Sequence, residues 1–309
     1  MKRTAVFDLD GTLETPYLEK KDVDAVRKTV SESYGAEAFE RMFANILGDM
    51  PHFFLNGALE LLQWVDAHGF EIVFFSNAVR PRNEELCPIL MERAFAGRKA
   101  PAYRLFSRPD CLDNRHGDPA GFGRDEVDGL WHGNFKKKLS GVVVDESEID
   151  ETLMIEDDSS YACRGEERNF IYGLYGGSAN EFLQYEAGVQ SYGGRDKVIP
   201  FHLPFWFCGM LSRTLNIAES EGVPLAVAAS RAMYGDEWKK LPAYGSYKPP
   251  KNGERDDKTW KIRDLLHPPQ RDFAIFKEGL LELRKLNPSL RFWGGIDESA
   301  SEWSKETIG

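Results

Sequence analysis

Two aspartates stand two residues apart directly after a short apolar run near the start of the chain. Asp8 and Asp10 follow residues 5–7 in the stretch AVFDLDGTLE. The apolar run predicts a buried strand, and side chains alternating with period two then place both carboxylates on the same side. A single aspartate after a strand is usually a turn former or a helix N-cap, but that role does not explain a pair. A close pair of like charges is costly unless a cation or a shared proton offsets it, so the pair predicts a metal site, acid–base chemistry, or both.

A second polar position follows another apolar run. Ser76 and Asn77 come directly after the predicted strand FEIVFF, residues 70–75. A hydroxyl in this place commonly caps a following helix. The free backbone N–H groups at such a helix start also bind anions, so capping and anion binding are compatible at this position.

Two further charged segments are candidates for the same site. The stretch GNFKKKLSG carries three consecutive lysines, residues 136–138, which could equally form a solvated surface run. The stretch TLMIEDDSS places three acids, residues 156–158, after an apolar run, where a solvated acidic turn is the alternative. Each signal is weak alone, but the order of aspartates, hydroxyl, lysine and acids along the chain is specific.

The stretch DLDGT after a hydrophobic strand resembles the first motif of the haloacid dehalogenase (HAD) superfamily. The resemblance implies that Asp8 is a nucleophile and that Asp10 is the general acid–base found in the phosphatases and mutases of that family. It further implies that Thr12, Ser76 and Asn77 contribute to binding the transferred phosphate.

The region around the lysines is similar to the FCP/SCP-type phosphatases, the NLI-interacting-factor-like branch of that superfamily. Their Arg-Leu-Phe-Arg and Gly-Asn-Tyr-x-Lys-Asp-Leu segments resemble YRLFSRPDCL and WHGNFKKKLS. On this match Lys137 is the lysine that neutralises the phosphate and the nucleophile, and Lys136 and Lys138 are surface neighbours. The first motif departs from the branch, because Gly11 stands where the branch usually has Glu.

The fourth motif of the family is a strand that ends in two acidic or acid-amide residues. Aligning EDDSS with the branch's Asp-Asn-Ser-Pro places Asp157 and Asp158 on those positions, and a one-residue slip to Glu156 and Asp157 stays open. The resemblance implies that Mg²⁺ is held by Asp8, the Asp10 carbonyl, and Asp157 or Asp158. Magnesium prefers six oxygen ligands and keeps several waters, so one acid from this motif suffices.

Composition and net charge limit the classes of partner and the cellular compartment to be expected for this chain. The chain has 309 residues and a formal net charge of −11, which disfavours a general nucleic-acid binder. The best apolar run, residues 199–211, is broken by His202 and Pro204, so no membrane span is expected. The four cysteines have no CxxC spacing, and no signal peptide precedes the first predicted strand. We therefore expect a cytoplasmic protein with free thiols.

The predicted elements indicate an α/β fold with a HAD-type, Rossmann-like parallel sheet flanked by helices. The helix over residues 56–69 followed by the strand over 70–75 is one helix–strand unit of such a sheet, whose ligands gather at the carboxyl ends of the strands. Residues 1–204 form the predicted core, with a small helical insert at 21–51 and an extended loop or hairpin at 108–134. Residues 205–309 form a mostly helical C-terminal region.

These features together predict a Mg²⁺-dependent phosphatase that works through an aspartyl-phosphate. The insert is too small to enclose a metabolite, so a phosphoprotein carrying phosphotyrosine, phosphoserine or phosphothreonine is the favoured substrate. A small phosphometabolite such as a sugar phosphate or nucleotide, cleaved or used in phosphotransfer, is the alternative. An inactive HAD domain that serves as a binding scaffold is the non-enzyme alternative.

Overall fold

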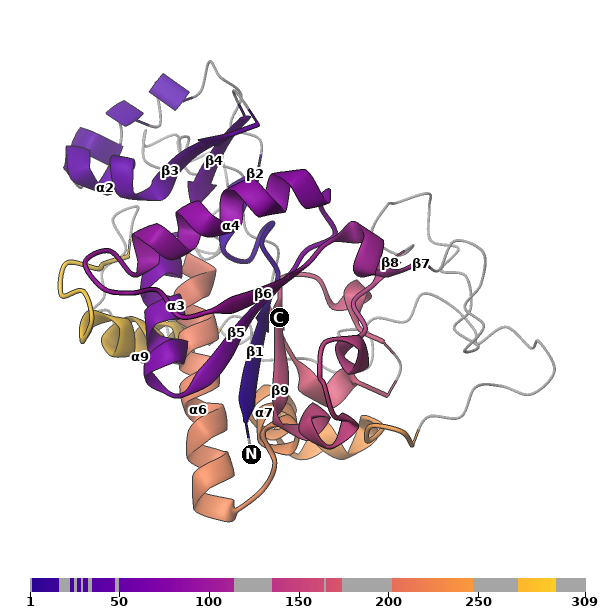
Figure 1. Ribbon diagram of the computed structural model, residues 1–309. Coiled ribbons are helices and arrows are strands. Elements are labelled where there is room, and N and C mark those ends of the chain that lie inside the picture. Colours follow the sequence, from indigo (N-terminus) through magenta and orange to yellow (C-terminus); the bar gives the residue numbers. More distant parts are fainter. Residues whose placement is uncertain are drawn as a thin grey trace, which may run out of the picture.

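A five-stranded parallel sheet forms the centre of the protein (Figure 1). The computed structural model describes residues 2–16, 23–24, 27–28, 30–32, 35–47, 50–113, 135–163, 165–173, 202–246 and 272–292. The strand order is β10-β9-β1-β5-β6, with β1 at Arg3–Phe7, β5 at Phe70–Phe75, β6 at Tyr103–Phe106, β9 at Thr152–Glu156 and β10 at Phe170–Tyr172. All four strand pairs are parallel, which confirms the predicted α/β class.

The central strands are apolar and buried on both faces, as expected for a parallel sheet with a cover of helices. In β1, Phe7 lies in register with Phe74 of β5 on one side and with Ile155 of β9 on the other. These three strands therefore end at nearly the same level. The residues that follow each of them, 8, 76 and 157, are brought to one edge of the sheet.

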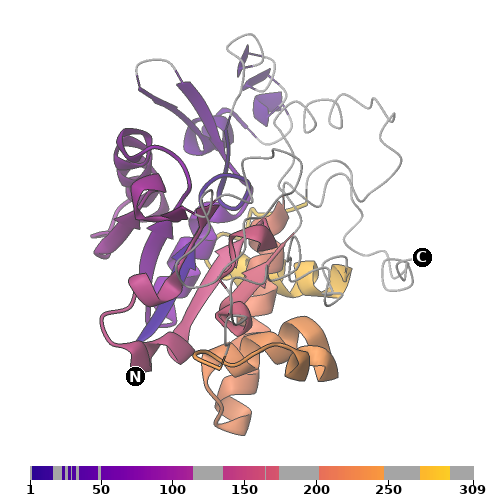
Figure 2. The ribbon, with the colours of Figure 1, turned by 90° about the vertical axis from the view of Figure 1, so that its right-hand side faces the viewer.

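Helices from both halves of the chain cover this sheet. Helix α3 (Ala58–Ala67) contacts β5, α4 (Arg80–Ala94) contacts β6, and α7 (Leu225–Tyr234) contacts β9 and β10. Helix α6 (Leu203–Glu221) packs on α3 and along α9 (Phe273–Arg284), and Figure 2 shows α6 and α7 together at the lower end of the molecule. The C-terminal helices therefore share the hydrophobic core of the sheet.

Two glycines allow α6 and α9 to cross closely. A Cβ added at Gly279 of α9 would lie 1.7 Å from the carbonyl oxygen of Phe205, and one at Gly209 of α6 would lie 2.2 Å from that of Ile275. No side chain fits at either place, so the two helices meet backbone to backbone. This contact holds the described C-terminal helices against the core.

The insert after the first motif contains a sheet as well as a helix, which corrects the expectation of a helical insert at 21–51. Strands β2 (Glu14–Pro16), β4 (Met50–Phe54) and β3 (Phe43–Ile46) form an antiparallel sheet in that order, next to α2 (Ala36–Met42) (Figure 1). The apolar residues of this segment recur at helical intervals, but the chain around residues 43–54 pairs with β2, which lies before the predicted insert.

The segment predicted as an extended loop or hairpin is described only at its ends. Residues 108–110 form a short 3-10 turn, and β7 (Leu112–Asp113) pairs antiparallel with β8 (Phe135–Lys136). Residues 114–134 lie outside the described part of the chain. Among the residues that are described, no helix combines the length and the apolar character needed to cross a bilayer.

Candidate active site

Three carboxylates meet at the carboxyl ends of β1 and β9. One oxygen each of Asp8, Glu156 and Asp157 lie within 4.8 Å of one another, and all three residues are buried. Asp8 is fixed by its backbone N–H, which donates to the Ile155 carbonyl at 3.0 Å. The parallel pairing of β1 with β9 therefore brings together two acidic segments about 150 positions apart in the sequence.

Lys137 lies against this cluster although it comes from a different segment. Its Nζ donates to Asp8 Oδ1 at 2.5 Å and to Glu156 Oε2 at 2.6 Å, and its side chain is fully buried. The ammonium also lies 4.4 Å from the centre of the Tyr161 ring. The backbone N–H of Lys137 donates to the Tyr161 carbonyl at 2.9 Å, which fixes the segment after β8 beside the loop after β9.

One lysine does not balance three buried carboxylates. Burial, and then the charge of Glu156, raise the pKa of Asp8 well above its usual range, and Lys137 opposes this shift. Burial, and then Asp8, raise the pKa of Asp157 to about 8. The pKa of Glu156 is likewise raised, first by burial. The cluster therefore needs a further cation if all three groups are to be ionised near neutral pH.

The donor set fits magnesium. Carboxylate oxygens are the hard ligands that Mg²⁺ takes in proteins, and three of them converge here from two adjacent loops. Gly11 allows these loops to approach closely, because a Cβ at this position would lie only 2.3 Å from Asp157 Oδ2. Gly11 also has φ of 79°, a conformation that favours glycine.

Asp10 lies beside the cluster in a separate set of contacts. Its Oδ2 accepts a hydrogen bond from Ser76 Oγ at 3.0 Å and another from Arg82 Nη1 at 3.0 Å, and its Oδ1 accepts from Arg82 Nη2 at 2.6 Å. Burial, and then Glu14, raise the pKa of Asp10, while Arg82 lowers it. About a third of the Asp10 side chain is exposed (33%), so it stays accessible to a ligand.

The other predicted phosphate ligands lie in the loops that follow β1 and β5. Thr12 is buried, and its hydroxyl has no hydrogen-bond partner among the described residues, which leaves it available to a bound anion. Ser76 Oγ accepts from the backbone N–H of Ala78 at 3.0 Å, so it makes a local turn while it contacts Asp10. Asn77 Nδ2 donates to the Tyr161 hydroxyl at 3.5 Å.

The three acids at the end of β9 differ in their contacts. Glu156 and Asp157 both belong to the carboxylate cluster, and Glu156 Oε2 also accepts from Lys137. Asp158 is outside that cluster, and its Oδ1 instead accepts from the backbone N–H of Ser160 at 2.8 Å as the cap of a short turn. Glu156 and Asp157 are therefore the two acids of this segment that lie together with Asp8.

The three consecutive lysines also differ from one another. Lys136 is buried and donates to the Ser160 carbonyl at 2.6 Å, which corrects its reading as a surface neighbour. Lys138 is exposed, as expected. The resemblance singled out Lys137, whereas the charge pattern of the segment did not show that Lys136 is buried, because its surroundings depend on the pairing of β8 with β7 and on the loop after β9.

Comparison with known proteins gives only distant structural likeness. No protein-family model and no curated protein matches the chain. The solved structure of Fcp1, an essential RNA polymerase II CTD phosphatase, is 12% identical with a TM-score of 0.38, and covers 74% of this chain and 70% of its own. A fission yeast Fcp1 variant bound to beryllium fluoride is 11% identical with a TM-score of 0.37 and the same coverage. Likeness at this level assigns no activity, so the description of the site depends only on its geometry in this structure.

Arg82 is a residue of this site that the sequence did not single out. It lies in the first turn of α4, six residues after Ser76, in the segment SNAVRPRNEEL. Several arginines and acids surround it in the sequence, and nothing in their spacing distinguishes it. Its role follows only from the packing of α4 against the loop after β1.

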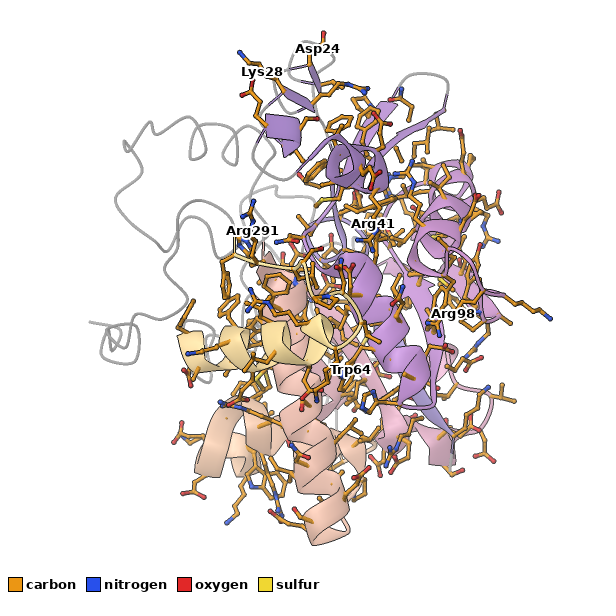
Figure 3. All side chains as sticks on the ribbon, turned by 90° about the vertical axis from the view of Figure 1, so that its left-hand side faces the viewer. Asp24, Lys28, Arg41, Trp64, Arg98 and Arg291 are labelled. Atoms are coloured by element: carbon orange, nitrogen blue, oxygen red, sulfur yellow. The ribbon has the colours of Figure 1, made fainter. Side chains whose placement is uncertain are left out.

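A cavity of about 300 Å³ lies apart from these residues. It is lined by Arg41 of α2, Arg291 after α9, and neighbours that include Asn56 and Asn287; Figure 3 shows Arg41 and Arg291 on the same side of the molecule. Arg41 is paired with the buried Glu60 at 2.6 Å. None of the predicted site residues lines this cavity.

The raised pKa of Asp157 predicts a pH-dependent stability for the metal-free protein. The folded state keeps the proton of Asp157 up to about pH 8, whereas the unfolded chain loses it near pH 4. The folded state thus binds more protons between these values, so this contribution to stability is full below about pH 4 and is lost as pH rises to 8. The substitution Asp157→Asn removes this pH-dependent contribution to stability.

We expect the stability of Asp157→Asn relative to the wild type to rise by about 1 kcal/mol or more between pH 5 and pH 8. Urea unfolding of both proteins in a chelator at several pH values measures this difference. A pH-independent difference would mean that Asp157 is not held protonated in the fold.

Proposed function

We propose that this protein is a magnesium-dependent phosphatase of the HAD type that works through an aspartyl-phosphate. One observation carries the proposal: Asp8 at the end of a central strand contacts Lys137 and lies with Glu156 and Asp157 in a buried cluster. Four segments that resemble the family's motifs thus supply one site, with Asp10 and Ser76 in contact beside it.

The residues of the site have separate tasks in the proposed reaction. A carboxylate oxygen of Asp8 attacks phosphorus and the bond to the leaving oxygen breaks, so a difficult displacement is divided into two easier ones. Asp10 gives its proton to the leaving oxygen, and then takes a proton from the water that hydrolyses the aspartyl-phosphate. Both steps need Asp8 and Asp10 on the same edge of the sheet.

Lys137 and the loop groups stabilise charge in this reaction. The Lys137 ammonium neutralises the nucleophile and the phosphate oxygens, and the Thr12 hydroxyl is a donor to those oxygens, whereas the Ser76 hydroxyl donates its hydrogen to Asp10. Asp8 and Asp157, with the carbonyl of Asp10, would hold Mg²⁺. When bound, the ion offsets the carboxylate charges and polarises the phosphoryl group.

Magnesium binding should depend on Asp157 more than on Asp158. Asp157 shares the cluster with Asp8, whereas Asp158 caps a turn, and Asn is also a good cap. We expect Asp157→Asn to weaken Mg²⁺ binding about tenfold or more, and Asp158→Asn to change it by less than about threefold.

Titration calorimetry with Mg²⁺ alone measures this without any substrate. Phosphatase activity should be lost to a chelator and restored by Mg²⁺ in the same preparations. Equal effects of the two substitutions, or a dominant effect of Asp158→Asn, would place the ion elsewhere.

We further propose that the substrate is a phosphorylated protein segment. Residues 9–75 between Asp8 and Ser76 include β2, α2, β3, β4, α3 and β5, so little chain is left for a large cover. The resemblance of the segment around Lys137 to phosphatases that act on proteins supports the same substrate class. A phosphometabolite enclosed by the C-terminal region is the competing possibility.

An open site gains specificity from contacts beside the scissile phosphate. We therefore expect kcat/KM to rise about tenfold or more when a free phospho-amino acid is extended to a phosphopeptide. Phosphate release from phosphotyrosine, phosphoserine and phosphothreonine, free and in peptides, is compared with that from sugar phosphates and nucleotides. If no peptide exceeds its free amino acid, while one metabolite is faster by orders of magnitude, the protein-substrate proposal is wrong.

A further inference from the structure

A buried chain of charged groups runs from Asp10 into the insert. Arg82 contacts both oxygens of Asp10 and also donates to Glu14 Oε1 through Nη2. Glu14 is wholly buried, and its other oxygen, Oε2, lies 2.7 Å from Nδ1 of His52. These four side chains come from the loop after β1, the start of α4, and strands β2 and β4. They therefore join the catalytic edge of the sheet to the antiparallel sheet of the insert.

Arg82 is placed to hold a carboxylate, and it is poorly placed to bind a phosphate. Its side chain is 5% exposed, while that of Asp10 is 33% exposed. Its Nη1 donates to Asp10 and to Asn83 Oδ1, and its Nη2 donates to Asp10 and Glu14. A ligand that reaches Asp10 would thus meet the carboxyl group, with the guanidinium behind it.

The two-point contact fixes the orientation of Asp10. A guanidinium that binds both oxygens of a carboxylate restrains its plane as well as its position, which a single donor cannot do. Ser76 adds a third hydrogen bond on Oδ2. Such restraint matters for proton transfer, because a displacement of about 1 Å in a catalytic group can cost about a hundredfold in rate.

We propose that Arg82 is the positioning residue of the general acid Asp10, and that Glu14 and His52 anchor it from the insert. This inference rests on the proposed phosphatase function. The insert then has a task besides any contact with substrate: its strands β2 and β4 supply the groups that hold Arg82 in place. An apolar set of similar volume is often as stable as buried charges of this kind, so a contribution to stability does not by itself account for them.

Leaving-group dependence separates positioning of the acid from a general structural effect. In the first step the proton of Asp10 moves to the leaving oxygen as the phosphorus–oxygen bond breaks. p-Nitrophenolate leaves readily without a proton, whereas phenolate or an alkoxide needs one. A variant with a displaced Asp10 should therefore lose more kcat/KM on phenyl phosphate than on p-nitrophenyl phosphate, while a partly unfolded protein loses the same factor on both.

The test compares Arg82→Gln and Arg82→Lys with Arg80→Gln, a control on the same helix whose exposed guanidinium pairs with Asp110. For Arg82→Gln we expect the loss on phenyl phosphate to exceed the loss on p-nitrophenyl phosphate by about tenfold or more. Arg82→Lys keeps the charge without the two-point contact and should show the same direction with a smaller ratio. His52 does not contact Asp10, yet His52→Asn should also lose more kcat/KM on phenyl phosphate than on p-nitrophenyl phosphate. Equal losses on the two substrates in the Arg82 variants would overturn the proposal, and an unchanged ratio in His52→Asn would remove the insert from it.

A crystal structure of Arg82→Gln decides the same point without activity. We expect the Asp10 carboxylate to leave Ser76 Oγ; retention of that contact in its present orientation would overturn the positioning role. If the wild type hydrolyses neither ester, the phosphatase proposal fails, and the structure of the variant still shows whether Arg82 positions Asp10. If Arg82→Gln does not fold, Arg82→Lys supplies both readouts.

Discussion

Asp8→Asn is expected to lower phosphatase turnover by about a thousandfold or more, because an amide is a far poorer nucleophile and metal ligand than a carboxylate. The side chain is nearly isosteric, so the fold should be kept. The substitution also removes one of three clustered acids, and the metal-free protein should therefore be as stable as the wild type or more stable. Loss of activity with undiminished stability is the expected combination.

Two measurements check this. Phosphate release under saturating substrate gives turnover, and rapid quenching with labelled substrate detects an aspartyl-phosphate, which the variant should not form. Asp24→Asn, at an exposed position of the insert, is the matched control and should behave as the wild type. Turnover above a few percent of the wild-type value would remove Asp8 from the nucleophile role.

Lys137→Met is expected to damage activity and stability together. The ammonium pairs with Asp8 and Glu156 in a fully buried position, so its removal leaves two carboxylates without their cation. Breaking a buried pair in this way costs about 3–5 kcal/mol of stability. The loss of charge stabilisation should lower kcat/KM by about a hundredfold or more.

The stability deficit of Lys137→Met should depend on pH in a definite direction. Burial raises the pKa of Asp8 and of Glu156, and Lys137 opposes both shifts. Without the lysine both values rise further, so the folded variant holds more protons than its unfolded chain over a wider pH range. Its stability is then greatest at low pH and is lost as pH rises, and the deficit relative to wild type grows from pH 5 to pH 8.

Urea unfolding at pH 5 and pH 8 measures the deficit, and the adjacent Lys138→Met is the control, since Lys138 is exposed. A deficit that stays constant with pH would show that Lys137 does not compensate the two acids. Wild-type kcat/KM in Lys137→Met would remove the lysine from the reaction.

The sequence predicted the strands and the polar residues that follow them, because both depend on the local pattern of apolar and polar residues. An apolar run such as residues 70–75 buries itself as a strand, and the first polar side chains after it must lie at the carboxyl end. Parallel pairing then collects Asp8, Ser76 and Asp157 at one edge, whatever the details of the loops. The parallel sheet and the convergence of these positions follow from that rule and from the register of β1 with its neighbours.

Tertiary packing decided which side chains of each polar segment meet. Among residues 156–158, the alignment placed Asp157 and Asp158 at the two acidic positions, whereas in the folded chain Glu156 contacts Lys137 and Asp158 caps a turn. The sheet of the insert formed because residues 14–16, which precede the predicted insert, pair with residues 52–54. The Arg82 contact arose because α4 packs beside the loop that carries Asp10. Strand ends are set by local hydrophobic pattern, whereas the partner of a charged side chain is set by elements distant in sequence, and only the folded chain supplies those.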